Sequence, residues 1–181
     1  MANFKEDLAK VEAFIFDIDG VFTDGSITPI PTPDGSIDIV RTYYAQDGYA
    51  VNYAHRNGYK IFIISGGHGA TLRRRFESLG ATEVHLEVVN KIGCLRDVIA
   101  RHGLNAENVV YMGDDIPDLE CMREVGLPVA PANAAWECVD AARYVSEFCG
   151  GRGCVRDVIE QVLRAHGKWA LNSEGVSFNH K

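Results

Sequence analysis

The sequence predicts an α/β fold in which a parallel sheet carries helices on both faces. Short apolar runs with the composition of β-strands alternate with helical segments along the chain. Three of these runs are followed directly by polar groups, and in open α/β sheets ligands bind beyond the carboxyl ends of the strands. We therefore expect a Rossmann-like parallel sheet with a binding site along one edge.

Length and charge narrow the class of protein further. The chain has 181 residues, 46% of them hydrophobic, which is enough for one domain with a substantial core and short for two. We expect a single domain over residues 1–167, followed by a polar tail over 168–181. No apolar run reaches the length of a membrane span and the N-terminus lacks the layout of a signal peptide, so we expect a cytoplasmic protein. A net charge of −7 argues against nucleic acid or an anionic membrane surface as the main partner.

The first apolar run ends in two carboxylates. Residues 14–16 are apolar, and Asp17, Asp19 and Gly20 follow them. Both carboxylates lie on one side of the chain if the strand alternation continues. Unpaired carboxylates so close together repel each other, and Mg²⁺, a hard cation that prefers oxygen ligands, is their natural partner. A strand that ends in an ordinary polar turn is the alternative, and this motif alone leaves both open.

The remaining elements alternate in order along the chain. A short helix is expected before the first strand, and two extended arms around a Pro/Asp/Gly turn predict a β-hairpin over about residues 26–45. Further strands are expected at 59–64, 84–86, 109–112, 128–130 and 143–145. Helices are expected from 47 to 56, up to 79, from 90 to 102, up to 126, from 134 onward, and from 154 to 166. The hairpin and single helices and strands fill the intervals between the polar motifs, so no cap domain fits between them.

The polar groups that follow three of the strands are expected to meet at one sheet edge. They are Asp17 and Asp19 after the first strand, Ser65 and Gly66 after the second, and Asp114 and Asp115 after the third. The acids suit a hard cation, whereas a hydroxyl with flexible backbone N–H groups suits phosphate oxygens. Lys91 opens a helix of its own and adds a point charge for the same phosphate. Taken singly, Lys91 is typical of an exposed helix start and Asp115 of a helix cap.

In this order, the motifs resemble those of the haloacid dehalogenase superfamily of phosphatases. The matching motifs are Asp17-Ile18-Asp19-Gly20, Ser65-Gly66, Lys91 and Gly113-Asp114-Asp115-Ile116-Pro117-Asp118. The resemblance extends over nearly the whole chain, from about residue 13 to residue 156. It implies a Mg²⁺-dependent phosphatase.

The resemblance also implies roles for the acids. Asp17 would be the nucleophile that forms an aspartyl-phosphate, and Asp19 the general acid and base. Mg²⁺ would be held by Asp17, the backbone carbonyl of Asp19, and Asp114. A carboxylate nucleophile divides hydrolysis into two easier steps, and a second carboxylate is needed because the first is occupied covalently.

The other motif residues would surround the phosphate. The resemblance places Ser65, Gly66 and Lys91 against the phosphoryl oxygens, and it implies that Asp118 orients Lys91 or a metal-bound water. Asp115 is expected beside them, outside direct contact with the metal. Phosphoryl transfer depends mainly on positioning and on neutralising charge, so the chemistry requires such a set.

A closer resemblance is to the capless 3-deoxy-D-manno-octulosonate 8-phosphate phosphatases. It rests on the hairpin and on residues 19–25, 46–48, 113–115 and 150–153. It implies a phosphorylated eight-carbon keto sugar acid as substrate, in lipopolysaccharide biosynthesis, and a homotetramer whose hairpins assemble a barrel and whose subunits close each other's sites. Similar sequences act on nine-carbon sialic-type acid 9-phosphates or accompany cytidylyltransferases. A nine-carbon substrate and a non-catalytic tetramerisation partner are therefore the alternatives.

Several positions bear on that choice. Family members commonly carry an arginine where Gln46 stands here and another where Gly67 stands. Both positions are expected near the sugar acid, so they leave the substrate open between eight and nine carbons. Among the histidines, His68 is expected near the substrate, and Arg152 either binds an anion or begins a helix.

Overall fold

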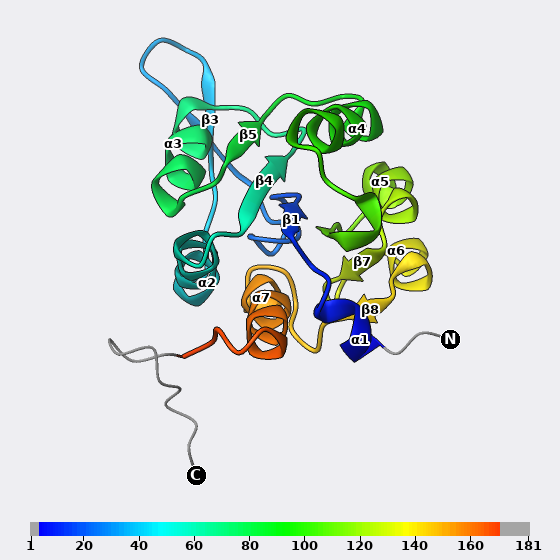
Figure 1. Ribbon diagram of the computed structural model, residues 1–181. Helices are drawn as coiled ribbons and strands as arrows, with labels where there is room; N and C mark the ends of the chain where they lie inside the picture. The colour runs from blue at the N-terminus through cyan, green and yellow to red at the C-terminus, as the bar shows by residue number, and fades with distance from the viewer. Residues whose placement is uncertain (1–3, 171–181) are drawn as a thin grey trace.

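The computed structural model describes residues 4–170 and contains a six-stranded parallel sheet (Figure 1). The strands are β1 (Ala13–Phe16), β4 (Lys60–Ile64), β5 (Glu83–His85), β6 (Val109–Met112), β7 (Leu127–Ala130) and β8 (Tyr144–Val145). Their order is β5-β4-β1-β6-β7-β8, and every neighbouring pair is parallel. The predicted parallel α/β fold is confirmed.

Helices cover both faces of the sheet, as expected. They are α1 (Phe4–Leu8), α2 (Ala45–Arg56), α3 (Ala70–Leu79), α4 (Lys91–His102), α5 (Leu119–Glu124), α6 (Trp136–Ala141) and α7 (Cys154–Ala165). Figure 1 shows α2, α3 and α7 on one side of the sheet and α4, α5 and α6 on the other. Short 3-10 turns, η1 (Ala106–Asn108) and η2 (Ile116–Asp118), precede β6 and α5.

Strand β1 lies inside the sheet, between β4 and β6, and is buried on both faces. Phe14 and Phe16 pack into the core on the side of α2 and α7, whereas Ile15 packs on the side of α4 and α5. A parallel strand covered on both faces has this continuous apolar composition. Because β1 is held on both faces and by both neighbouring strands, it fixes the position of the next residue, Asp17, at the carboxyl edge of the sheet.

The predicted hairpin forms a separate two-stranded antiparallel sheet of β2 (Thr28–Pro31) and β3 (Ile37–Val40). It projects away from the body of the molecule (Figure 1). Its apolar side chains are open to solvent, with Ile27 54% and Ile37 65% exposed. Between β1 and β4 the chain forms this hairpin and α2, so it has no cap domain there.

The described chain continues past α7 into the first residues of the expected tail. Trp169 is buried, with its ring centre 5.2 Å from that of Tyr53 and 5.3 Å from the Arg156 guanidinium carbon. The rest of the tail, residues 171–181, lies outside the described residues. No helix of residues 4–170 is both long enough and apolar enough to cross a bilayer.

Asp47 links α2 to α7. Its carboxylate is buried and accepts hydrogen bonds from the backbone N–H groups of Arg156, at 2.8 Å, and Gly153, at 3.2 Å. Asp47 thus caps the start of α7, while its own helix begins earlier than expected, at Ala45. Burial raises the pKa of Asp47 to about 6, against the opposing effect of the two N–H donors.

We expect Asp47 to make the free energy of unfolding depend on pH. Its pKa in the folded protein, about 6, lies above the ordinary value of 3.8, so the folded state binds this proton more tightly. The resulting stabilisation is complete below about pH 4 and is lost as the pH rises through about 6. Relative to Asp47→Asn, the wild type is expected to lose about 1–3 kcal/mol between about pH 4 and pH 7 in urea titrations. A difference between the two proteins that stays constant with pH would contradict this expectation.

Candidate active site

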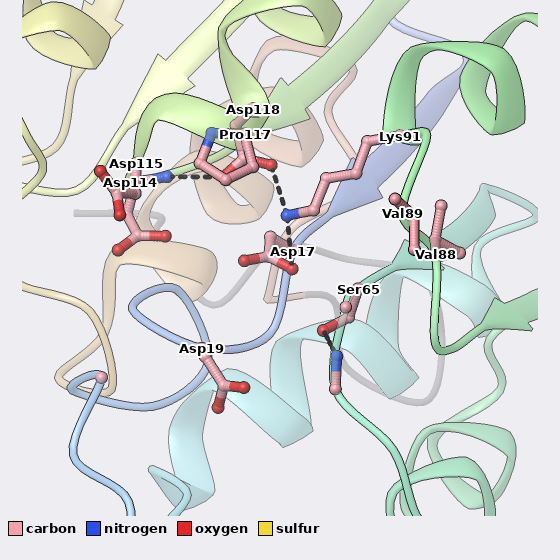
Figure 2. Close-up of a pocket in the computed structure, with 13 residues that line it drawn as sticks. Asp17, Asp19, Ser65, Val88, Val89, Lys91, Asp114, Asp115, Pro117 and Asp118 are labelled. Carbon is pink, nitrogen blue, oxygen red and sulfur yellow. Dashed lines mark hydrogen bonds and ion pairs between the residues drawn. The ribbon is translucent and has the colours of Figure 1, made fainter.

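A cavity of about 480 Å³ opens at the carboxyl ends of β1, β4 and β6. The residues expected to take part in catalysis, phosphate binding or metal binding line this cavity, called here the catalytic cavity (Figure 2): Asp17, Asp19, Ser65, Gly66, Lys91, Asp114, Asp115 and Asp118. The rest of the lining consists of Gly25, Gly67, Val88, Val89 and Pro117. The structure therefore brings the separate strand-end motifs together at one place.

Lys91 is the cation at the centre of the cavity. Its Nζ lies 3.0 Å from Asp17 Oδ1 and donates a hydrogen bond of 2.8 Å to Asp118 Oδ1. All three side chains are buried. The Asn90 side chain accepts a hydrogen bond from Gly93 N and so caps α4, which fixes Lys91 as the first residue of that helix. The helix start thus sets where the ammonium group enters the site.

Asp118 holds Lys91 through a network that also includes Tyr111. The Tyr111 hydroxyl donates a 2.6 Å hydrogen bond to Asp118 Oδ1, and the backbone N–H of Asp114 donates to Oδ2 at 3.2 Å. Both oxygens of Asp118 are therefore engaged by the protein. Tyr111 was not among the site residues predicted from the sequence, although a tyrosine in a fully buried strand needs a partner for its hydroxyl and so carried a signal.

Burial and mutual repulsion raise the pKa of the acids that face the cavity. Burial first, and then the charge of Asp118, raise the pKa of Asp17 to about 6, with Lys91 acting in the opposite direction. Burial, followed by Asp17 and Asp118, raises the pKa of Asp114 to about 7. Burial works against the ammonium of Lys91, but Asp17 and Asp118 outweigh it and raise its pKa, so Lys91 stays charged. One lysine does not offset these carboxylates, and the site favours a further cation.

The oxygen atoms present suit Mg²⁺. One carboxylate oxygen each from Asp17, Asp114 and Asp118 lie within 4.8 Å of one another. Because Asp118 is engaged with Lys91 and Tyr111, Asp17 and Asp114 are the acids left for a metal. Gly20 allows this approach, since it has φ +85° and a Cβ there would lie 1.9 Å from Asp114 Oδ2. Carboxylate oxygens converging in this way are the ligands that Mg²⁺ prefers.

The side chain of Asp19 lies apart from this cluster (Figure 2). Its two oxygens accept hydrogen bonds from Arg41, with 2.7 Å from Nε to Oδ1 and 3.0 Å from Nη2 to Oδ2. The Asp19 carboxylate is therefore paired with Arg41 and does not join the three acids that converge on one another. Arg41 was not predicted from the sequence, because no local pattern pairs a residue at the end of the hairpin with an acid 22 positions earlier.

Two loops that would face a phosphate are joined to each other. Backbone N–H groups of Glu87 and Val88 donate to the carbonyl oxygens of Gly67, at 2.9 Å, and Ser65, at 3.0 Å. The Ser65 hydroxyl oxygen also accepts from Gly67 N at 3.1 Å. Glu87 adopts φ +60°, a left-handed conformation that is uncommon for a residue with a side chain. The loop before Lys91 is thus held against the Ser65 loop by a strained residue.

Other residues singled out in the sequence lie elsewhere. Gln46 and Arg152 line a second cavity of about 270 Å³, and Arg152 lies 3.9 Å from Asp24. His68 lines a third cavity beside α3. Asp115 faces the catalytic cavity but also accepts a hydrogen bond from Ile116 N at 2.8 Å, which is the capping contact that its position suggested.

Comparison with known proteins agrees with this geometry. A family model of haloacid dehalogenase-like hydrolases matches residues 72–153. The chain is 33% identical over 159 residues to the 3-deoxy-D-manno-octulosonate 8-phosphate phosphatase of Escherichia coli K12, and the match covers 88% of this chain and 82% of that protein. The chain belongs to this phosphatase family. The family resemblance and the enzyme class expected from the sequence are confirmed.

Solved structures resemble this phosphatase over most of its length. The 3-deoxy-D-manno-octulosonate 8-phosphate phosphatase of Moraxella catarrhalis, in complex with magnesium, phosphate and KDO, has a TM-score of 0.82 at 28% identity and covers 89% of this chain and 90% of its own. A cobalt-bound phosphatase from Haemophilus influenzae has a TM-score of 0.83 at 27% identity and covers 93% and 96%. These ions agree with the expectation of Mg²⁺ at a site of carboxylate oxygens.

The positive φ of Glu87 can be tested by substitution. Replacing Glu87 by glycine is expected to raise the free energy of unfolding by about 0.5–1 kcal/mol, because glycine adopts φ +60° without steric cost. Glu77→Gly is the matched control, since it places the same change inside α3 and is expected to lower stability by about 1 kcal/mol. Urea denaturation measures both. A loss of stability in Glu87→Gly would show that the conformation is not strained.

Metal binding is expected to weaken as the pH falls. With pKa values of about 6 and about 7, Asp17 and Asp114 take up protons below neutral pH, and these protons compete with Mg²⁺. The dissociation constant for Mg²⁺, measured by calorimetry, is expected to rise roughly tenfold or more between about pH 8 and pH 5.5. Asp114→Asn is expected to bind Mg²⁺ weakly at both pH values. Equal affinity of the wild type at both pH values would rule out these two acids as the ligands.

Proposed function

We propose that this phosphatase hydrolyses a phosphorylated sugar acid in a Mg²⁺-dependent reaction, through an aspartyl-phosphate on Asp17. The observation that carries the proposal is the position of Asp17, at the end of β1 and 3.0 Å from Lys91, in a cavity that also holds Asp114. A carboxylate in this place has a cation beside it, and the Ser65 loop, with its hydroxyl and backbone N–H groups, lines the same cavity. Those are the surroundings that an attack on a phosphoryl group needs.

The first half of the reaction transfers the phosphoryl group to the enzyme. An oxygen of Asp17 attacks phosphorus, the ester P–O bond breaks, and the leaving oxygen takes a proton from Asp19. Lys91 and the Ser65 loop hold the phosphoryl oxygens, and Asp118 keeps Lys91 in place. Bound Mg²⁺, with Asp17, Asp114 and the Asp19 carbonyl as ligands, would supply positive charge for these oxygens.

The second half releases inorganic phosphate. Water attacks phosphorus, the P–O bond to Asp17 breaks, and the Asp19 carboxylate takes a proton from the attacking water, which restores the proton that Asp19 lost to the leaving oxygen. Asp17 returns as a free carboxylate beside Lys91. Asp17 and Asp19 therefore take separate roles, and their side chains lie apart in the structure, with different partners.

The proposed substrate is 3-deoxy-D-manno-octulosonate 8-phosphate. This proposal is supported by the 33% identity to a phosphatase of that compound and by a cavity of about 480 Å³. A nine-carbon sialic-type acid 9-phosphate is the second candidate, because glycine stands at residue 67 where arginine is common. Gln46 bears less on this choice, since it lines a different cavity.

We propose that the working form is a homotetramer in the cytoplasm, active in lipopolysaccharide precursor synthesis. The hairpin supports this, because its exposed isoleucines are an apolar surface that a neighbouring subunit would cover. A capless chain also leaves its catalytic cavity open to water, which neighbouring subunits would exclude. A non-catalytic tetramerisation partner of a cytidylyltransferase is the alternative, and the retained set of Asp17, Lys91 and Asp114 argues against it.

The deciding experiment measures Mg²⁺-dependent phosphate release from a panel of substrates. The panel holds the eight-carbon 8-phosphate, nine-carbon 9-phosphates and hexose 6-phosphates, compared by kcat/KM. We expect the eight-carbon acid to be preferred by about tenfold or more. Preference for a nine-carbon acid would change the substrate and leave the mechanism standing, whereas no release from any member would support the non-catalytic alternative.

The nucleophile is tested by Asp17→Asn. Phosphate release is expected to fall by about a thousandfold or more, because an amide does not form the covalent intermediate. Circular dichroism and thermal unfolding check that the variant folds. Turnover at the wild-type rate in the folded variant would exclude Asp17 as the nucleophile.

A further inference from the structure

Arg41 engages the whole carboxylate of Asp19. Its Nε and Nη2 donate to the two oxygens of Asp19 at 2.7 and 3.0 Å, in the parallel geometry that makes such pairs strong and specific. The Arg41 side chain is 6% exposed and that of Asp19 is 31% exposed. The arginine is therefore the fixed member of the pair, and the aspartate is the member with room to turn.

This pair conflicts with the role proposed for Asp19. To exchange a proton with the leaving oxygen and then with water, Asp19 must present an oxygen to the reacting group. In the structure both oxygens face Arg41. An Asp19 oxygen that turns toward the reacting group gives up its hydrogen bond to Arg41, and this leaves the buried guanidinium short of a partner unless another anion replaces Asp19.

Arg41 also lines a second space where such an anion fits. A cavity of about 580 Å³ lies beside the catalytic cavity and is lined by Arg41, Arg75, His68 and Tyr43, among others. The Arg75 guanidinium carbon lies 5.7 Å from the centre of the Tyr43 ring. Asp38 is the acid among the lining residues, and its Oδ1 accepts the N–H of Ile39. The cavity, called here the anion cavity, thus has more cationic than anionic groups.

Glycine at residue 67 leaves space for the Arg41 guanidinium on the side of the Ser65 loop. A Cβ at Gly67 would lie 3.3 Å from Arg41 Nη2 and 3.3 Å from Ser65 Oγ. A larger side chain there would crowd the guanidinium on the side of the Ser65 loop. Arg41 therefore lines the anion cavity itself and also contacts Asp19, which lines the catalytic cavity.

We propose that Arg41 is a positioning residue that holds Asp19 away from the reacting group until a carboxylate of the substrate enters the anion cavity and takes the place of Asp19 on the guanidinium. Asp19 then turns toward the leaving oxygen. This inference rests on the proposed function. In this mechanism the carboxylate of the substrate contributes to binding and also releases Asp19 for catalysis. A sugar phosphate without a carboxylate leaves Asp19 bound to Arg41.

The test compares Arg41→Gln and Arg41→Lys with the wild type on two substrates. One is the eight-carbon acid 8-phosphate and the other is a hexose 6-phosphate, which has no carboxylate. In Arg41→Gln we expect kcat for the hexose phosphate to rise by about threefold or more, while kcat/KM for the acid falls by about tenfold. Arg41→Lys keeps the charge without the parallel pair and is expected to restore part of the preference for the acid.

A matched control removes a similar ion pair elsewhere. Arg96 donates two hydrogen bonds of 2.9 Å to Glu124 on the surface, so Arg96→Gln removes a pair of the same geometry whose residues line neither cavity. It is expected to leave kcat and KM for both substrates unchanged. Thermal unfolding of all variants separates a loss of folded protein from an effect on Asp19.

A second measurement supplies the carboxylate separately. Pyruvate added to the wild type is expected to increase turnover of the hexose phosphate, and to have no such effect on Arg41→Gln. If Arg41→Gln lowers turnover of both substrates equally and pyruvate has no effect on the wild type, the holding role of Arg41 is wrong and the phosphatase mechanism stands. If the wild type releases phosphate from neither substrate, the proposed function fails and this inference fails with it.

Discussion

The site depends on the repulsion between acids that the sheet brings to one edge. Asp17, Asp114 and Asp118 converge, and Lys91 is the buried cation among them in the described chain. Burial strengthens both the repulsion and the attraction, because the effective dielectric constant is lower than in water. The arrangement is stable in a folded chain because Asp118 is satisfied by Tyr111 and Lys91, while the remaining charge suits a metal and a phosphate.

The parallel sheet explains why these groups meet. The interior strand β1 has β4 and β6 as its neighbours, with Phe16 beside Ile63 in one and Met112 in the other. Each strand ends at the same level, so the residues that follow face one another across short distances. The core on both faces keeps the three strand ends from moving apart. The geometry of the site is a consequence of register in the sheet.

The sequence predicted those parts of the site that follow from local pattern. Asp17 and Ser65 come directly after apolar strands, Asp114 follows one after a single glycine, and Lys91 begins a helix, so the local pattern was enough to predict where they lie. The contacts of Tyr111 and Arg41 could not be predicted from local pattern, since each side chain contacts an acid from a different segment of the chain. Helix α2 began earlier than predicted for the same reason, because Asp47 caps α7 and not its own helix.

The position of Arg41 in the chain connects the hairpin with the chemistry. Arg41 directly follows β3, whose exposed apolar residues are the surface expected to contact another subunit. Its guanidinium is nonetheless buried against Asp19, so the same short segment faces outward at one end and the catalytic cavity at the other. A capless phosphatase has no second domain to close over its substrate. In this chain the hairpin is the element that both extends from the core and leads directly into Arg41, which contacts Asp19, so it connects the exposed apolar surface with the cavity.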